Sequence, residues 1–210
     1  TLEDLEAYRP VERGVIAGSY RGFEIVGPPP PASSGVHVTQ MLNILEGYDV
    51  AGMGFGSAES LDLLARTIAL AFADRRAASG DPDFVDIPYK GLMDPDYLKS
   101  RMADFTFDRA TLSSEVGHGT VEIVESSETT HYSIIDAEGN AISATTTLNG
   151  GYGSKLYIDA LGFFLNNEMD DFSTKPGVPN MFGLPGSEAN SIAPEKRMLS
   201  SMSPTIVERD

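Results

Sequence analysis

The chain has 210 residues, and its 15 basic and 31 acidic side chains give a formal net charge of -16. With 41% hydrophobic residues it can bury one sizeable core or two small ones, so we expect globular structure and not a disordered chain. The negative charge repels phosphate groups, which excludes nucleic acid as an expected partner. The absence of cysteine excludes disulfides and thiolate metal ligands, and no apolar run approaches the length of a membrane-spanning helix.

A strand and a helix are predicted within the first fifty residues. Residues 20–27 read as a short strand, and four consecutive prolines then enforce a stiff, extended connection. A helix is expected to begin at residues 33–35 and to end at Gly47. Its apolar side chains recur at helical spacing, and we expect this helix to pack on a sheet. This apolar stripe consists of Val38, Met41, Leu42 and Leu45.

Two more helices are predicted before the middle of the chain. The longer one follows Ser57, which can cap its first turn, and Gly80 lies just past its end. An Asp-Pro pair at residues 94–95 is typical of the start of a shorter helix that runs to about Met102. Residues 106–128, rich in Ser, Thr, Gly and acidic side chains, indicate an exposed connector. One face of the longer helix carries Leu61, Leu64, Ile68 and Phe72.

Strands predominate after the connector. Residues 131–136 and 141–148 read as two strands, joined by a short turn at residues 137–140 that contains glycine. Residues 161–165 predict a third short strand, and residues 175–193, with three prolines and three glycines, predict a long irregular loop. Helical patterns followed by strands indicate an α+β layered domain.

Several common types of site find no support in the sequence. Glycine-rich residues 52–56 and 150–155 lack the spacing and residue order of nucleotide-binding loops. His37, His118 and His131 lie far apart, without the spacing of a helical metal site, so no metal and no cofactor is expected. We interpret His37 as a helix-surface or core residue and His131 as a hydrogen-bonding partner. The G-x-S-x-G pattern of conventional serine hydrolases is absent.

A different nucleophile is suggested where the acidic connector meets the first strand, at Thr129. A threonine that becomes N-terminal has a hydroxyl and an α-amine, whose ordinary pKa of about 7.7 to 8.0 makes it a usable base near neutral pH. One residue then supplies nucleophile and base. On the residues alone, the simpler interpretation, that Thr129 and Thr130 merely begin a β-branched strand, is favoured.

A family resemblance reverses this preference. Residues 129–133, 147–149, 166–172 and 199–205 resemble successive motifs of the γ-glutamyltranspeptidases of bacterial type, in the family's order. The first 128 residues resemble the C-terminal part of that family's large subunit, so the likeness covers the whole chain. The family belongs to the N-terminal-nucleophile hydrolases, which implies an αββα four-layer sandwich, here truncated at both ends.

The resemblance implies a precursor that matures by cutting itself. Residues 1–128 would belong to the large subunit and residues 129–210 to the small, catalytic subunit, together forming one structural unit. The scissile bond would join Glu128 to Thr129, and the two subunits would remain together as a heterodimer. A periplasmic or extracellular location is implied, with any export signal upstream of this chain.

The resemblance also implies a role for individual residues. Thr129 would be the nucleophile, and Thr147 would hydrogen-bond to it and orient it. The α-amino group of the γ-glutamyl donor would be held by Asn149, Glu168 and Asp171. Acidic partners suit an ammonium group.

Other positions are expected to complete the donor site. Ser200 and Ser201 resemble the pair that binds the donor's α-carboxylate, a role that hydroxyl groups can fill. Residues 176–186 resemble a lid, in which Phe182 takes the place of an aromatic gate that is often tyrosine. The family's carboxylate-binding arginine and its Gly-Gly oxyanion hole, which follows Ser201, belong to segments that this chain does not include.

The implied reaction is γ-glutamyl transfer from glutathione or related donors to an amino acid, a peptide or water through a threonyl ester. This 210-residue polypeptide by itself is expected to be inactive. One alternative is a cephalosporin (glutaryl) acylase relative, whose donor lacks the α-amine; Asn149, Glu168 and Asp171 argue against it. Another alternative is a non-catalytic structural fragment.

Overall fold

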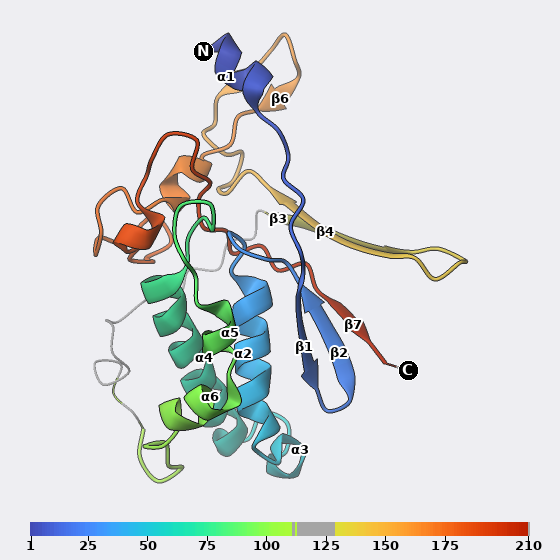
Figure 1. Cartoon of the computed structure of the whole chain (residues 1–210), viewed down its shortest axis with the longest axis vertical. Helices are drawn as coiled ribbons and strands as arrows, with labels where there is room; N and C mark the ends of the chain where they lie inside the picture. The colour runs from blue at the N-terminus through green and yellow to red at the C-terminus, as the bar shows by residue number, and fades with distance from the viewer. Residues whose placement is uncertain (111, 113–128, 210) are drawn as a thin grey trace.

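The computed structural model describes residues 1–110, 112 and 129–209. Apart from the short N-terminal helix, the α-helices gather on one side of the molecule, and the described strands form one three-stranded and two two-stranded sheets (Figure 1). Within the described residues, no helix is both long and apolar enough to cross a membrane. The predicted mixture of helices and sheets is therefore confirmed. Most of the predicted connector, with His118 and Glu128, lies outside the described residues.

The three-stranded sheet begins with a tight hairpin. Strands β1 (Ile16–Tyr20) and β2 (Phe23–Gly27) pair antiparallel, and β7 (Ile206–Glu208) pairs with the other edge of β2. The predicted single strand at residues 20–27 is therefore wrong. The two turn residues, Arg21 and Gly22, have φ angles of 51° and 82°, the left-handed conformation that two-residue hairpins require. Arginine is unusual in such a turn, so residue types alone do not predict this hairpin.

Helix α2 (Ser34–Glu46) packs on this sheet, as predicted (Figure 1). Its first turn comes close to the end of β2, because a Cβ atom on Gly27 would lie 2.7 Å from the Cα of Gly35. The predicted apolar stripe is only half-buried. The buried positions are Ser34, Gly35, Val36, His37, Thr39, Gln40 and Ile44. The helix therefore buries polar side chains that a purely apolar pattern does not reveal.

Helix α4 (Ala58–Ala78) has the predicted cap, since the Ser57 hydroxyl accepts a hydrogen bond from the backbone N–H of Ser60. Its buried face, however, differs from the predicted one. Leu61, Leu64 and Phe72 are 57%, 41% and 39% exposed. The face that packs on α2 and α6 instead carries Leu63, Arg66, Thr67, Leu70, Ala71 and Asp74. Because α4 is apolar on several faces, helical period alone could not select the buried one.

Helix α6 (Pro95–Arg101) completes the helical layer and starts at the predicted Asp94 cap. Leu98 of this helix joins an apolar cluster with Ile44 of α2 and Leu70 of α4. Three short helices were not predicted: α1 (Leu2–Ala7), α3 (Val50–Met53) and α5 (Tyr89–Leu92).

The helices are also joined by a chain of polar side chains. His37 is buried and contacts Gln40 and Ser79 through its two ring nitrogens, at 2.9 and 3.2 Å. Gln40 donates to Asp74, which also accepts from the Tyr97 hydroxyl at 3.0 Å. Burial lowers the pKa of His37 to about 4, so its imidazole is neutral near pH 7.

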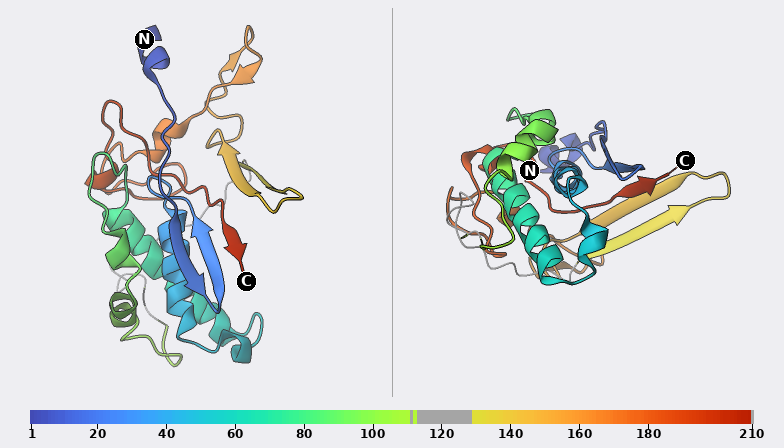
Figure 2. Two further views of the ribbon diagram at one scale, coloured as in Figure 1. Left: turned by 45° about the vertical axis from the view of Figure 1, so that its right-hand side comes forward. Right: turned by 90° about the horizontal axis from the view of Figure 1, so that it is seen from below.

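A second hairpin projects away from the helices (Figures 1 and 2). It consists of β3 (Thr129–Ile135) and β4 (Ala141–Thr147), and the predicted pair of strands is confirmed. Strands β5 (Tyr157–Ile158) and β6 (Phe163–Phe164) form the third sheet, so the predicted strand at 161–165 is shorter than expected. Beyond it, residues 175–193 are irregular apart from the 3₁₀ helix η2 (Glu188–Asn190).

Candidate active site

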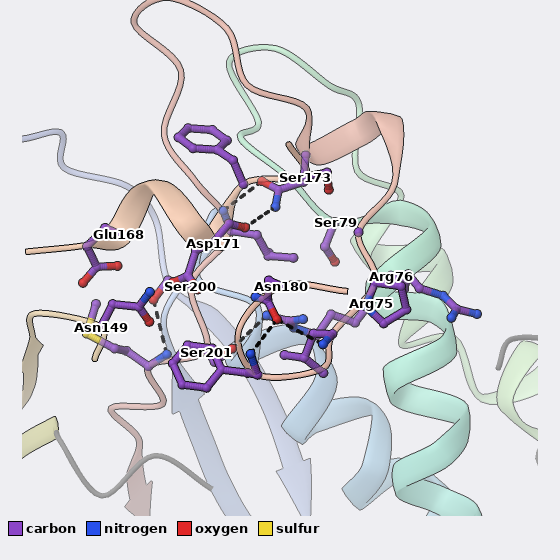
Figure 3. Close-up of a pocket in the computed structure, with 18 of the residues that line it drawn as sticks. Arg75, Arg76, Ser79, Asn149, Glu168, Asp171, Ser173, Asn180, Ser200 and Ser201 are labelled. Atoms are coloured by element: carbon purple, nitrogen blue, oxygen red, sulfur yellow. Dashed lines mark hydrogen bonds between the residues drawn. The ribbon is translucent and has the colours of Figure 1, made fainter. Parts of the chain in front are cut away.

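A cavity of about 540 Å³ lies where the C-terminal end of α4, the open end of the β3–β4 hairpin and the loops between residues 168 and 203 meet (Figure 3). Its size is in the usual range for small-molecule sites. Every site residue expected from the sequence lines this cavity. They are Thr129, Thr147, Asn149, Glu168, Asp171, Phe182, Ser200 and Ser201.

The register of the hairpin places Thr129 opposite Thr147. At the far end, the Asp136 carboxylate accepts hydrogen bonds from the backbone N–H groups of Glu138 and Asn140, which fixes the turn. At the cavity end, the Thr129 hydroxyl donates to the Thr147 hydroxyl oxygen at 3.2 Å. The turn therefore sets the register that brings Thr129 and Thr147, 18 positions apart in the sequence, next to each other.

Asn149 follows β4 directly and turns the chain into the cavity. Its φ angle of 75° is left-handed, a conformation that asparagine adopts more readily than most residues. Its backbone N–H donates to the Thr147 hydroxyl at 3.0 Å, and its side-chain amide donates to the carbonyl of Asn167 at 3.3 Å. These bonds hold the strand end against the next segment of the site.

Glu168 and Asp171 are the two ends of a single 3₁₀ turn, η1 (Glu168–Asp171). Residues three apart in such a helix share one face, so both carboxyl groups reach the cavity. Burial, followed by the charge of Asp171, raises the pKa of Glu168 to about 7. Burial also raises the pKa of Asp171 to about 6, although Arg75 and hydrogen bonds from Glu168 and Asn149 oppose the rise. A cation bound between the two carboxyl groups would favour their ionised forms.

Ser200 and Ser201 lie beside the start of α2. The Ser200 N–H donates to the Pro31 carbonyl and its carbonyl accepts from the Ser33 N–H, both at 3.0 Å. These two bonds form a short parallel bridge between Ala32 and Ser200. The two serines, late in the chain, are therefore fixed by the segment before the first long helix.

The predicted lid, residues 176–186, is a closed loop with its own hydrogen bonds. The backbone N–H of Gly177 donates to the Gly186 carbonyl at 2.9 Å, which closes its base. At its tip, the Asn180 side-chain oxygen accepts from the N–H groups of Phe182 and Leu184, each at 3.0 Å. Phe182 lines the cavity. The loop thus presents an apolar ring to the site without a bound ligand.

Sequence reasoning missed two residues that organise the cavity. Arg75, in the last turn of α4, donates to the hydroxyls of Ser33 and Ser201 at 2.9 and 2.8 Å. Asn190 is buried and bonds to the Asp171 carbonyl at 2.7 Å and to the Leu199 N–H at 3.0 Å. Their partners lie far away in the sequence, and the only local sign was a pair of arginines at a helix end.

The two ends of the cavity differ in charge. Figure 3 shows Glu168 and Asn149 on one side and Arg75 on the side of α4, with Ser200 and Ser201 between them. Such a site suits a ligand that carries an ammonium and a carboxylate close together. Within the described residues, no group of three or more His, Asp or Glu side chains is arranged to hold a metal ion.

The fold, with a threonine at the first position of a strand that opens on a cavity, is that of the N-terminal-nucleophile hydrolases. A cephalosporin acylase from Bacillus halodurans has this fold, with a TM-score of 0.76 and 22% identity over 100% of this chain and 35% of its own. The γ-glutamyltranspeptidase of Helicobacter pylori aligns over 60% of this chain and 36% of its own, with a TM-score of 0.54 and 35% identity.

The family model of gamma-glutamyltranspeptidase matches residues 1–210, and the chain belongs to that family. All 210 residues of the chain align with the glutathione hydrolase proenzyme of Escherichia coli (strain K12) at 49% identity, and the alignment covers 36% of that protein. The chain also aligns with the acylase ACY 1 proenzyme of Pseudomonas sp. (strain SE83) at 46% identity over 202 residues. That alignment covers 96% of this chain and 34% of the acylase proenzyme. The chain thus spans about a third of the length of these relatives.

Proposed function

We propose that the complete protein transfers or hydrolyses γ-glutamyl groups of glutathione and related amides through a threonyl ester. The observation that carries the proposal is the meeting of Thr129, the acidic pair and Ser201 in one cavity. The Thr129 hydroxyl attacks the γ-carbonyl while its α-amine takes the proton. The proton passes to the departing amine, and water or an amino acceptor then breaks the ester by the reverse route.

The charge pattern of the cavity supports a γ-glutamyl donor. Its α-ammonium would face Glu168 and Asp171, whose raised pKa values reflect burial without a sufficient cation. Its α-carboxylate would accept hydrogen bonds from Ser200 and Ser201. Together these contacts would leave the γ-carbonyl pointing towards Thr129.

Maturation by cleavage between Glu128 and Thr129 belongs to the same proposal, because the α-amine exists only after the cut. Residues 1–128 and 129–210 would then form parts of two subunits. Strand β7 pairs with β2, and Ser200 pairs with Ala32, so hydrogen bonds would hold the two pieces together as a heterodimer. A periplasmic or extracellular location remains part of the proposal.

A glutaryl acylase is the second candidate, favoured by the similarity to the acylase ACY 1 proenzyme. A glutaryl donor has the carboxylate but not the α-amine. It would leave two partly buried carboxyl groups without the ammonium that would pair with them, which a site of this kind disfavours.

The test compares γ-glutamyl and glutaryl anilides as donors of the full-length gene product. We expect the γ-glutamyl compound to have a kcat/KM at least about 10- to 100-fold higher, because hydrogen bonds to charged groups contribute about 1.5 to 3 kcal/mol. Asp171→Asn should reduce this preference strongly. Asp159→Asn, which removes the same charge from an exposed side chain that does not line the cavity, is the matched control.

The outcomes separate the candidates. Equal kcat/KM for both anilides would favour the acylase. Activity that survives Thr129→Ala would exclude the threonyl ester and with it both candidates.

A further inference from the structure

Arg75 lines the cavity but has no role in the proposed reaction as described above. It comes from the last turn of α4, and its side chain lines the cavity. Its Nη2 atom donates to the Ser201 hydroxyl at 2.8 Å, and its Nε atom donates to the Ser33 hydroxyl at 2.9 Å. One guanidinium therefore bridges α4, the start of α2 and the serine segment.

The direction of these hydrogen bonds is fixed by chemistry. A guanidinium has only donors, so the Ser201 oxygen must accept from Arg75 and the Ser201 hydrogen must point elsewhere. A hydroxyl that accepts from a cation is also polarised into a stronger donor. Ser201 is thereby prepared to donate to an anion in the cavity.

A second route leads from Arg75 to Ser200. The Ser33 hydroxyl accepts from Arg75 and donates its own hydrogen to the Ser200 carbonyl at 3.0 Å. The Ser33 N–H donates to the same carbonyl, also at 3.0 Å. Arg75 thus fixes one serine directly and the backbone of the other through a single intermediate.

The charge of Arg75 is placed to distinguish the two ends of a zwitterion. Burial lowers its pKa to about 10, with Asp171 acting in the opposite direction, so it remains a cation near pH 7. Glu168 lies at one side of the cavity, Arg75 lies beside the serine hydroxyls at the other side, and Asp171 lies between them (Figure 3). A carboxylate next to Ser201 would therefore gain a nearby positive charge.

We propose that Arg75 is a positioning residue for the α-carboxylate of the donor, acting through Ser201 and Ser33. The proposal rests on the proposed function for the orientation of the donor. It adds a cation to the carboxylate end from within this chain. The competing explanation is that Arg75 only ties α4 to the serine segment and contributes to stability.

The two explanations differ in their dependence on the ligand's carboxylate. Calorimetry on the full-length gene product should compare L-glutamate with 4-aminobutyrate, which lacks only the α-carboxylate. We expect Arg75→Gln to weaken L-glutamate binding about 10- to 100-fold and 4-aminobutyrate binding less than about 3-fold. A purely structural role would weaken both equally, and that result would overturn the proposal.

Matched variants sharpen the test. Lys99→Gln removes one positive charge from an exposed site on α6 and should change neither affinity more than about 2-fold, as expected for a screened surface charge. Arg75 and Ser201 should not act independently, so adding Arg75→Gln to Ser201→Ala should cost much less than Arg75→Gln alone. Full additivity would contradict a role through Ser201.

Two further outcomes are decisive. If Arg75→Gln does not fold, Arg75→Lys serves instead, because lysine keeps the charge but loses the forked geometry of the guanidinium. We expect the same selective loss of L-glutamate binding. An equal loss of binding for both ligands overturns the proposal. A wild-type protein that binds both ligands equally would also overturn it. If L-glutamate binding behaves as proposed but a γ-glutamyl anilide is not cleaved, the proposed function fails and the role of Arg75 stands.

Discussion

At the scale of single residues, the acidic pair of Glu168 and Asp171 links the stability of the cavity to pH. Glu168 keeps a proton up to about pH 7 because it is partly buried next to Asp171. A raised carboxyl pKa means that ionisation is less favourable in the folded state than in the unfolded chain. The pair therefore reduces the free energy of unfolding as pH rises through this range, and a bound ammonium would relieve that loss.

Binding of L-glutamate should accordingly depend on pH. The pKa values of Asp171 and Glu168, about 6 and about 7, predict that affinity rises between pH 5 and pH 7.5 as both groups ionise. We expect a rise of at least about 10-fold, measured by calorimetry, since a hydrogen bond to a charged group contributes about 1.5 to 3 kcal/mol.

Two controls belong to this pH experiment. Glutarate, which lacks the amine, should show no such rise. Glu168→Gln should remove the part of the rise near pH 7 and leave the part near pH 6. A flat profile for L-glutamate would contradict the assignment of the acidic pair to the ammonium.

The sequence predicted the residues expected to contact the donor better than the residues that hold them in place. Thr129, Asp171 and Ser201 occur in motifs whose order could be compared with a family, and all three line the cavity. Arg75 and Asn190 act through contacts with residues far along the chain, such as the bond from Arg75 to Ser201. No local pattern encodes a contact of this kind, so it becomes visible only in the fold.

At the scale of elements, local signals predicted helices well and their buried faces poorly. The caps at Ser57 and Asp94 are interactions within one turn, and both were confirmed. The buried face of α4 depends on what α2 and α6 present to it, and that face includes Thr67 and Asp74. The hairpin of β1 and β2 was missed because its turn uses Arg21 where Asn is usual.

The lid offers a test of whether its internal bonds serve catalysis. In Asn180→Ala, the N–H groups of Phe182 and Leu184 lose their shared acceptor. Because each of the two hydrogen bonds contributes about 1 kcal/mol, we expect the KM for the donor to rise about 3- to 30-fold. A larger share of the acyl-enzyme should also be lost to water, because a loosened lid excludes it less well.

Asn180→Asp keeps the acceptor oxygen and is the matched control for the lid. Limited proteolysis within residues 176–186 gives a readout that does not depend on turnover, and Asn180→Ala should be cut faster than Asn180→Asp. Equal proteolysis and equal KM in the two variants would show that the turn does not position the lid.

At the scale of the whole molecule, apolar side chains remain exposed at several places, among them β3 and α4. Every residue of β3 is exposed, including Ile134 at 54% and Ile135 at 75%. Leu61, Leu64 and Phe72 of the stripe predicted on α4 are exposed as well. The relatives are about three times as long as this chain, and we expect the corresponding faces of a protein of that length to be covered.

A polypeptide of only these 210 residues should therefore remain uncut between Glu128 and Thr129 and should release no aniline from a γ-glutamyl anilide. A two-stranded hairpin without a covering layer is marginally stable, so β3 would not hold the Thr129 hydroxyl steadily in the attacking position. Attack on the Glu128 carbonyl also builds negative charge on its oxygen, and each missing oxyanion donor costs about 10² to 10³ in rate. The Gly-Gly pair that the resemblance places after Ser201 does not occur in residues 202–210. Intact mass spectrometry after prolonged incubation, together with the anilide assay, checks both halves: a fragment that begins at Thr129 would show that cleavage needs neither the covering layer nor those donors, and released aniline would show the same for turnover.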